Sequence, residues 1–593
     1  MSETQSAKDV LWDIGDLFAD AEDPKLHAEM QEAKQLASSF TKTYRGKVES
    51  LTAAGLNEAV AAYEKIQSLL GRAYVFAELS YSTDTSDQAR GAFVQKVQEL
   101  DAAIETQTLF FKLEWIALDD AKARSSLASQ EMSAYRHWLE LLRRDKPHVL
   151  SEPEEKVLKE TSMSGSAAWK RLFTDLAGAF TVDFDGESLT FEAALSKLYS
   201  PEREVRRTAA RAITTELERG LRTRTFVLNT ILLDKATTDR LRNYPTWISD
   251  RNLSNEASDE SVQALIDAVV SRYDIAQRYY RLKARLLGLD KIADYDRFAP
   301  VSVDSTTVTW DEGKRIVLEA YHDFSPEAGK IIGRFFDDNW IDAAAYPNKS
   351  PGAYCMTVVP YHHPYVLMNY TDDRNSVFTL AHELGHGLHG VLGGSQSLLN
   401  ANTPLTLAET ASVFGEALTF SRYLRDVTEP KQRLSLLTGR LEDAIGTSFR
   451  QIALNRFEES VHLARRDEGE LAVERINELW RKAQTHLFQD SVEVTDDYNI
   501  WWSYIAHFFE WPGYVYAYSF GYLFSLAIYQ KYLEDKDAMV APYMELLAAG
   551  GSDSPERLAK IVGIDVSDPG FWTRGLDAID SWLKEAEVLA EKI

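Results

Sequence analysis

The sequence has few positive charges and almost no cysteine. Its 593 residues include 65 Lys and Arg against 91 Asp and Glu, which gives a formal net charge of −26 at pH 7. This balance argues against nucleic acid or an anionic membrane surface as a partner, because both attract basic proteins. Cys355 is the single cysteine, so no intrachain disulfide framework exists, and we expect a reducing, cytoplasmic compartment.

We expect no N-terminal targeting signal, because residues 1–9 are polar and contain no apolar core. Residues 511–530 carry no charged side chain and reach the length of a membrane span of about 20 residues. This run contains a proline, two glycines, five tyrosines and two serines. So many hydroxyl groups favour a buried or cleft-lining helix over a lipid-facing one, and we expect no membrane partner.

Long helical patterns dominate the first part of the chain. Apolar residues recur every three or four positions in residues 25–44, 56–80 and 87–118, where Gly and Pro are sparse. This pattern predicts antiparallel helices that act as a scaffold. Asp185-Gly186, between two short apolar runs, predicts a β-hairpin.

A chain of this length exceeds one compact core, so several subdomains are expected. We expect an N-terminal helical lobe in residues 1–115, a connecting helical segment with the hairpin in residues 116–195, and a third domain in residues 196–593, which contains the motifs described next. Two features are given a structural role only. Residues 11–18 are expected to pack onto another part of the protein, and Arg203, Arg206, Arg207 and Arg211 are expected to form a solvated helix face.

The most informative stretch contains His-Glu-x-x-His at residues 382–386, with Asn375 and Ser376 as candidate N-caps of a helix. Residues four apart lie about 40° apart around a helix, so His382 and His386 share a face and can hold one metal ion. Glu383 lies about 100° away, which suits a general base acting on a metal-bound water. Two imidazole ligands favour zinc. The alternative is a chance match in a helix-rich chain.

A catalytic zinc needs a third protein ligand and one open position. His389 falls near the same face, but one helix cannot easily wrap it onto the same ion, so we interpret it as a supporting or core residue. Glu409 and Glu416 are seven residues apart on a predicted helix that starts at Leu405, and they share a face. One can bind the metal while the other orients a histidine. Their spacing does not choose between them, and two solvated glutamates are the alternative.

Two short strands are predicted just before this helix, in residues 351–358 and 364–370. In zinc peptidases, an edge strand beside the metal helix often takes the substrate backbone as an added strand. By that analogy one of these strands holds a peptide; a purely structural sheet is the alternative. His362 and His363 lie in the connecting loop, where they either approach the site or are simply exposed.

A further candidate group follows His507. Tyr514, Tyr518 and Tyr522 recur at four-residue steps and therefore share one helical face. An aromatic core stripe is one interpretation. Three phenol hydroxyls that each need a partner favour a wet cleft instead.

His382-Glu383-Leu384-Gly385-His386, followed by Glu409-Thr410-Ala411-Ser412, resembles the thimet oligopeptidase family of zinc metallopeptidases, and most of all its oligoendopeptidase F members. The resemblance is specific in about residues 350–525 and general elsewhere. In that family the glutamate that opens the second motif is the third zinc ligand. The resemblance thus implies that Glu409 binds zinc and that Glu416 supports the site.

The resemblance also implies a role for the His507 group. In the family, a histidine and tyrosines from a Gly-Tyr-rich helix face the zinc and donate hydrogen bonds to the scissile carbonyl as it becomes an oxyanion. His507 matches that histidine. Tyr514 and Tyr522 are the preferred tyrosines and Tyr518 is the weaker match.

These observations predict a mainly α fold with a small β element next to the zinc helix, and two helical lobes flanking a deep cleft. The expected function is that of an endopeptidase with one Zn²⁺ per chain, which hydrolyses internal bonds of short unstructured peptides with Glu383 as general base. One rival is a zinc carboxypeptidase or dipeptidase, which needs a cationic group for the substrate's C-terminal carboxylate. The other is a catalytically idle helical scaffold that binds peptides.

Overall fold

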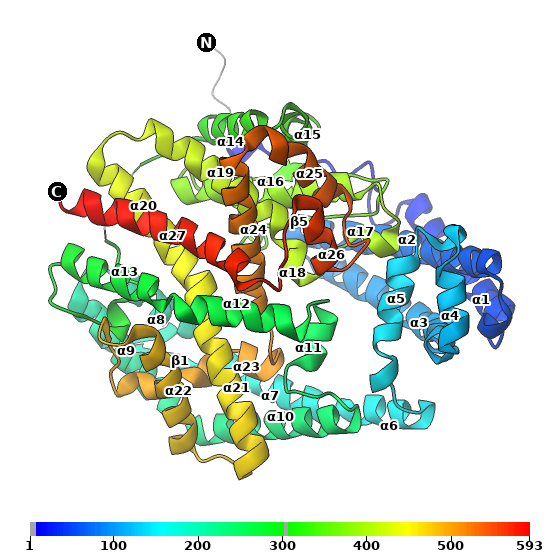
Figure 1. Ribbon diagram of the computed structural model, residues 1–593, viewed down its shortest axis with the longest axis horizontal. Coiled ribbons are helices and arrows are strands. Elements are labelled where there is room, and N and C mark those ends of the chain that lie inside the picture. The colour runs from blue at the N-terminus through cyan, green and yellow to red at the C-terminus, as the bar shows by residue number, and fades with distance from the viewer. Residues whose placement is uncertain (1–6, 302–305, 593) are drawn as a thin grey trace. The chain divides into compact units, whose positions relative to one another are not determined.

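The computed structural model describes residues 7–301 and 306–592 (Figure 1). Helices account for most of these residues and the strands are few and short, which confirms the predicted mainly α fold. The chain divides into two compact units, each built from three separate stretches. The first unit comprises Met1–Lys146, Ser305–Asp426 and Ile528–Asp565, and the second comprises Pro147–Asp304, Val427–Ala527 and Val566–Ile593. The division into three consecutive sequence blocks stays a prediction.

The first unit holds the N-terminal helices together with the helix that carries the His-Glu-x-x-His motif. Its helices are α1 (Pro24–Tyr44), α2 (Ala53–Thr83), α3 (Gln88–Ala117), α4 (Asp120–Leu127), α5 (Arg136–Arg144), α14 (Trp310–Phe324), α15 (Pro326–Asp337), α16 (Arg374–Gly393), α17 (Leu398–Ala401), α18 (Leu405–Ala408), α19 (Thr410–Asp426), α25 (Lys536–Ala548) and α26 (Pro555–Ala559).

Helices α1, α2 and α3 pack side by side, as the blue and cyan ribbons of Figure 1 show. Thr52 is the N-cap of α2. Its hydroxyl accepts the Gly55 amide N–H at 3.1 Å and so satisfies one of the donors that a helix start leaves free. The buried side chains of α2 join an apolar core that also contains Val358, Val359 and Tyr365. The helical scaffold therefore packs directly against the segment that precedes α16.

That segment forms a three-stranded sheet of β4 (Ile341–Asp342), β6 (Tyr365–Leu367) and β5 (Tyr354–Met356), in this order. Strand β6 pairs parallel with β4 and antiparallel with β5, so β5 lies at an edge of the sheet. Both β5 and β6 contact α16. The small β element predicted beside the motif helix is thereby confirmed.

Helix α16 packs against α14, α15, α19 and α25 as well as the sheet. Its buried side chains include Val377, Leu380, Leu384 and Leu388. A helix surrounded in this way is apolar on most sides. Four of its polar side chains, those of His382, Glu383, His386 and His389, line a cavity.

The second unit is also helical. Its helices are α6 (Glu152–Ser162), α7 (Ser166–Gly178), α8 (Phe191–Ser196), α9 (Arg203–Glu218), α10 (Leu221–Leu241), α11 (Ser249–Ser254), α12 (Asp259–Ser271), α13 (Tyr273–Leu286), α20 (Pro430–Ala444), α21 (Gln451–Glu468), α22 (Val473–Phe488), α23 (His507–Glu510), α24 (Tyr516–Glu534), which continues into the first unit at Ile528, and α27 (Pro569–Ala590).

The predicted hairpin is present as β1 (Thr181–Phe184) and β2 (Glu187–Thr190). Asp185 and Gly186 turn the chain with φ of 53° and 84°, which suits an Asp-Gly hairpin turn. A parallel pair, β3 (Ile292–Ala293) with β7 (Val492–Glu493), is the other small sheet of this unit among the described residues.

The arginines of α9 do not all face solvent, contrary to the expectation from their clustering. Arg206 is 1% exposed, and its Nη2 lies 2.8 Å from Oδ1 of the fully buried Asp296. Arg203 pairs with the other oxygen of the same carboxylate at 2.9 Å. Sequence spacing did not reveal this partner because it lies about ninety residues further along the chain.

Residues 511–530, which approach the length of a membrane span, fall largely within α24. No helix among the described residues combines the length and apolar character that crossing a membrane requires.

Candidate metal centre

A cavity of about 390 Å³ lies beside α16 in the first unit. Helix α16 contributes His382, Glu383, His386 and His389 to its lining, and Glu409 closes another part of it. The edge strand β5 and the residues around it supply a further wall, which includes Ala353, Tyr354, Cys355 and Thr357. The residues singled out by the two motifs thus meet in one cavity.

Helix α16 begins earlier than expected. Asp373 is its N-cap, and its carboxylate accepts the Ser376 amide N–H at 2.8 Å. Asn375 and Ser376, the N-caps expected from sequence, instead lie in the first turn. The carboxylate of Asp373 reaches a free amide one turn on, so it can occupy the capping position.

Three ligand atoms converge at the cavity. Glu409 Oε2 lies 3.3 Å from His382 Nε2 and 3.6 Å from His386 Nε2, and these ligand atoms all lie within 4.8 Å of one another. Zinc bonds to nitrogen and oxygen are about 2.0–2.1 Å long, so tetrahedral ligands of one ion lie about 3.3–3.4 Å apart. The spacing and chemistry of these three side chains therefore fit a zinc ion.

Neighbouring side chains hold these groups in place. Glu409 caps the end of α18 with φ −83° and ψ 3°, directly before α19 begins. Ser412 donates its hydroxyl hydrogen to Glu409 Oε2 at 2.6 Å. On the far side of the imidazole, His382 Nδ1 lies 3.4 Å from Glu416 Oε2. A hydrogen on Nδ1 leaves the Nε2 lone pair facing the cavity.

The electrostatics of the cavity suit metal binding. Burial raises the pKa of Glu383 to about 7, with Glu409 adding to the effect and His382 opposing it. Burial lowers the pKa of His386 to about 4. Burial alone would raise the pKa of Glu409, but its contacts with His382 and His386 dominate and lower it to about 2. A neutral imidazole and an ionised carboxylate are the forms in which these groups bind metals.

The remaining histidine of the motif helix has a different setting. His389 is 9% exposed and lines the same cavity, and burial lowers its pKa to about 4. It is not one of the three residues whose ligand atoms converge. This agrees with its interpretation as a supporting or core residue.

Two glycines that sequence patterns did not single out let α16 and α19 approach each other. A Cβ on Gly385 would lie 2.6 Å from Ser412 Cα, and a Cβ on Gly415 would collide with the Tyr321 hydroxyl. That hydroxyl donates to the Ala381 carbonyl oxygen at 2.8 Å. The signal was available, because both motifs contain a glycine among small residues, but one chain read alone does not show which segments face each other.

In the second unit, His507 gathers a cluster of aromatic side chains. Its Nε2 lies 3.1 Å from Tyr518 Oη, and its ring centroid lies 6.0 Å from that of Tyr514. Tyr522 is 5% exposed, and Arg440 lies over its ring at 5.7 Å. Its hydroxyl has no hydrogen-bond partner among the described residues. The structure thus groups Tyr514 and Tyr518 with His507, while the preference for Tyr522 stays a prediction.

Comparison with known proteins gives consistent matches along the chain. A family model described as "Peptidase family M3" matches residues 196–578, and one described as "Oligopeptidase F" matches residues 114–181. Oligopeptidase PepF of Bacillus subtilis is 28% identical over 591 residues, which cover 98% of this chain and 87% of that protein. Group B oligopeptidase PepB of Streptococcus agalactiae is 26% identical, with 88% of each chain covered.

Solved structures share the fold. A protein from Chlamydophila abortus superposes with a TM-score of 0.87 at 23% identity, covering 99% of this chain and 100% of its own. Oligoendopeptidase-F from Enterococcus faecium superposes with a TM-score of 0.71 at 22% identity, covering 96% and 99%. At these identities the likeness concerns the arrangement of helices.

Proposed function

Because the chain belongs to peptidase family M3, we propose that it is a zinc-dependent endopeptidase that hydrolyses internal bonds of short, unstructured peptides. The observation that carries this proposal is the convergence of His382, His386 and Glu409 in one cavity that Glu383 also lines. The cytoplasmic location stays a prediction from the single cysteine.

In this proposal His382, His386 and Glu409 hold one zinc ion. When bound, zinc supplies a Lewis acid that polarises water and a carbonyl oxygen. Glu416 keeps the hydrogen of His382 on Nδ1, and Ser412 holds the carboxylate of Glu409. These contacts preset the ligands, so little side-chain freedom is lost when the ion binds.

Glu383 acts as the general base. It follows His382 directly and lies 6% exposed in the lining of the cavity. A carboxylate here takes a proton from the attacking water and later delivers it to the leaving amine. Its burial keeps competing bulk water away from that proton.

Strand β5 is the candidate substrate edge. It borders the cavity through Tyr354 and Cys355 and lies at the edge of its sheet. An extended peptide can add to such an edge through backbone hydrogen bonds, which favours unstructured substrates over folded ones. We extend the proposal to His507, with Tyr514 and Tyr522, as donors to the scissile carbonyl oxygen. Because Tyr518 contacts His507, it belongs in the same mutational test.

Two alternatives make different demands on the cavity. A zinc carboxypeptidase or dipeptidase needs a cation for the terminal carboxylate, and the described residues that line this cavity include no Lys or Arg. A catalytically idle peptide-binding scaffold does not require the buried carboxylate of Glu383 next to three potential metal ligands. Both observations favour the endopeptidase.

The test is mass spectrometry of a peptide pool, from short peptides to a folded domain, incubated with the wild type or with Glu383→Gln. We expect internal cuts in short peptides by the wild type, and turnover reduced by about 10²–10⁴-fold in the variant with zinc content unchanged. Removal of C-terminal residues alone would support the carboxypeptidase. A pool left intact by zinc-loaded wild type would support the scaffold.

A further inference from the structure

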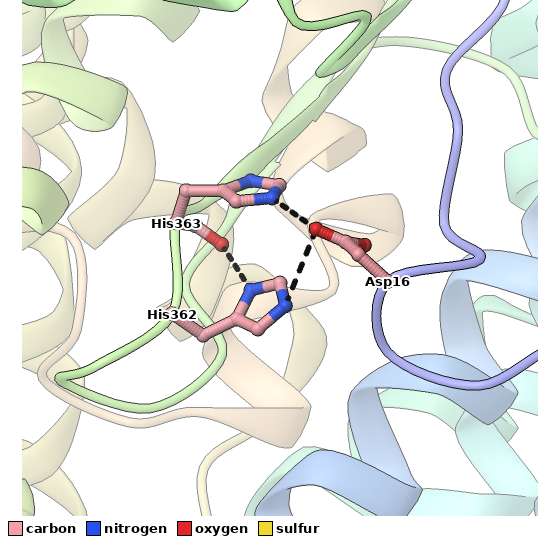
Figure 2. Close-up of side chains that lie close together, drawn as sticks. All are labelled: Asp16, His362 and His363. Atoms are coloured by element: carbon pink, nitrogen blue, oxygen red, sulfur yellow. Dashed lines mark hydrogen bonds and ion pairs between the residues drawn. The ribbon is translucent and has the colours of Figure 1, made fainter.

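A second group of metal-binding side chains lies in the first unit. Asp16 comes from the segment before α1, and His362 and His363 come from the loop between β5 and β6 (Figure 2). Asp16 Oδ2 lies 2.6 Å from His363 Nε2 and 3.5 Å from His362 Nε2. One ligand atom from each residue lies within 4.8 Å of the other two. None of the three lines the cavity of the first site.

Both imidazoles turn Nδ1 away from the carboxylate. His362 Nδ1 lies 3.1 Å from the His363 carbonyl oxygen, and His363 Nδ1 lies 3.1 Å from the Pro364 carbonyl oxygen (Figure 2 draws the first of these). A carbonyl oxygen only accepts hydrogen bonds, so each Nδ1 carries hydrogen. In a neutral imidazole, Nε2 is then a bare lone pair. Proteins orient histidine ligands of metals in this way.

Two lone pairs that face one carboxylate oxygen repel it unless a positive charge lies between them. A proton on either ring or a divalent cation can supply that charge. Both Nε2 atoms face the same oxygen of Asp16, at 3.5 Å and 2.6 Å, so one cation between them would be shared by all three groups. Arg72 is paired with another carboxylate, because its Nε lies 3.3 Å from an oxygen of Glu29.

Neighbouring side chains also fix the positions of these potential metal ligands. The His363 ring stacks on Trp340 with centroids 3.8 Å apart and planes 7° apart, and Tyr365 donates its hydroxyl hydrogen to the other oxygen of Asp16. The side chains of His362 and His363 are 12% and 15% exposed, whereas that of Asp16 is 49% exposed. The rings are therefore fixed while the carboxylate side stays open to solvent, which leaves a position for water on a bound ion.

We propose that Asp16, His362 and His363 bind a zinc ion with a structural role, separate from the ion of the first site. Two imidazoles and one carboxylate suit a borderline cation such as zinc. Ligands of one zinc lie about 3.3–3.4 Å apart. The exposed Asp16 carboxylate therefore has to withdraw from His363 by only roughly 0.7 Å. This inference does not rest on the proposed function.

The ion would fasten two distant segments. The Val10 carbonyl oxygen accepts the Ala343 amide N–H at 2.9 Å, and Asp13 donates its amide to the Asn339 carbonyl oxygen at 2.9 Å. These two hydrogen bonds attach residues 10–13 to the residues on either side of β4. The loop that carries the histidines also contributes Thr357 and Pro360 to the cavity of the first site. Zinc at Asp16 would therefore brace one wall of that cavity.

The test counts zinc per chain by mass spectrometry of metals, on full-length protein loaded with zinc at pH 8 and dialysed. We expect two ions in the wild type, one in Asp16→Asn/His363→Gln and one in His382→Ala/His386→Ala. The matched control is His27→Gln, which removes a histidine that faces a single carboxylate at 3.7 Å and should keep two.

A second measurement guards against misfolding. In the His382→Ala/His386→Ala background, zinc should raise the Tm because it binds only the folded form, and the conservative Asp16→Asn change should abolish that rise. If the wild type binds one ion and His382→Ala/His386→Ala binds none, the second site is overturned and the proposed function stands. Asp16 and the two histidines then share a proton in place of a metal ion. If the wild type binds one ion and Asp16→Asn/His363→Gln binds none, the second site is upheld and zinc binding at the first site is overturned.

Discussion

Replacing Gly385 by Ala should separate the two helices that position the proposed metal ligands. The new Cβ would lie 2.6 Å from Ser412 Cα and 2.7 Å from the Ala411 carbonyl carbon. Non-bonded carbon atoms rest about 3.5–4.0 Å apart. The obstacle is backbone, which has no other rotamer, so α16 and α19 must part by roughly 1 Å.

This displacement acts on the metal site directly. The ligand atoms of His382 and His386 lie on α16, and they are 3.3 and 3.6 Å from Glu409 Oε2 next to α19. Metal bonds tolerate about ±0.2 Å, so a shift of roughly 1 Å weakens at least one ligand. We expect zinc affinity to fall by at least about 10-fold and kcat by about 10²-fold. Overpacking should also lower the free energy of unfolding by about 1–3 kcal/mol.

The assay combines zinc affinity from competition with a chelator, peptide turnover, and urea unfolding of the metal-free protein. The matched control is Gly333→Ala in α15, where a Cβ meets nothing within 4 Å. That change should stabilise the helix by up to about 1 kcal/mol and leave zinc binding unchanged. Wild-type zinc affinity and turnover in Gly385→Ala would refute the claim that this glycine sets the spacing of the two helices.

Three further predictions concern other contacts. Glu416→Ala should weaken zinc binding about 10–100-fold by releasing the imidazole it orients, measured by chelator competition; unchanged affinity would contradict that role. Glu458 is buried and its folded pKa is raised to about 8, above its unfolded value of about 4.5. The folded chain thus keeps a proton that the unfolded chain releases, so stability should fall by up to roughly 1.4 kcal/mol per pH unit between those values. Urea unfolding from pH 5 to 8 should show that the free energy of unfolding depends less on pH in Glu458→Gln than in the wild type. An identical pH dependence would contradict this role of Glu458. Asp296→Asn should cost about 3–5 kcal/mol of unfolding free energy by leaving Arg206 buried without its charge partner, whereas Glu204→Gln, at an exposed pair on the same helix, should cost under about 1 kcal/mol.

The choice of the third ligand shows the limit of helical spacing. Glu409 and Glu416 share a face of an ideal helix, so spacing left both as candidates, and only the resemblance singled out Glu409. In the structure the helix breaks at Glu409. The two carboxylates then approach different nitrogens of His382, Glu409 near Nε2 and Glu416 near Nδ1. Which of the two binds the ion stays a prediction, and the geometry is what separates their roles.

Predictions that depended on local sequence patterns were the ones the structure confirmed. The long helices, the Asp185-Gly186 hairpin and the adjacency of His382 to His386 follow from backbone geometry over a few residues, so neighbours along the chain encode them. The prediction for the α9 arginines was wrong because a distant partner changed the outcome. Arg206 looked like part of a solvated face, yet Asp296 holds it in the interior.

The sequence by itself determined the helical class, the candidate metal-binding helix and the residue types able to hold zinc, because each depends on short-range spacing and side-chain chemistry. Tertiary structure alone decided how closely α16 and α19 approach, and that Asp16 meets His362 and His363 across nearly 350 residues of chain. Such meetings depend on how apolar surfaces pack between remote segments. The local spacing of apolar residues along the chain does not reveal which remote segments pack together.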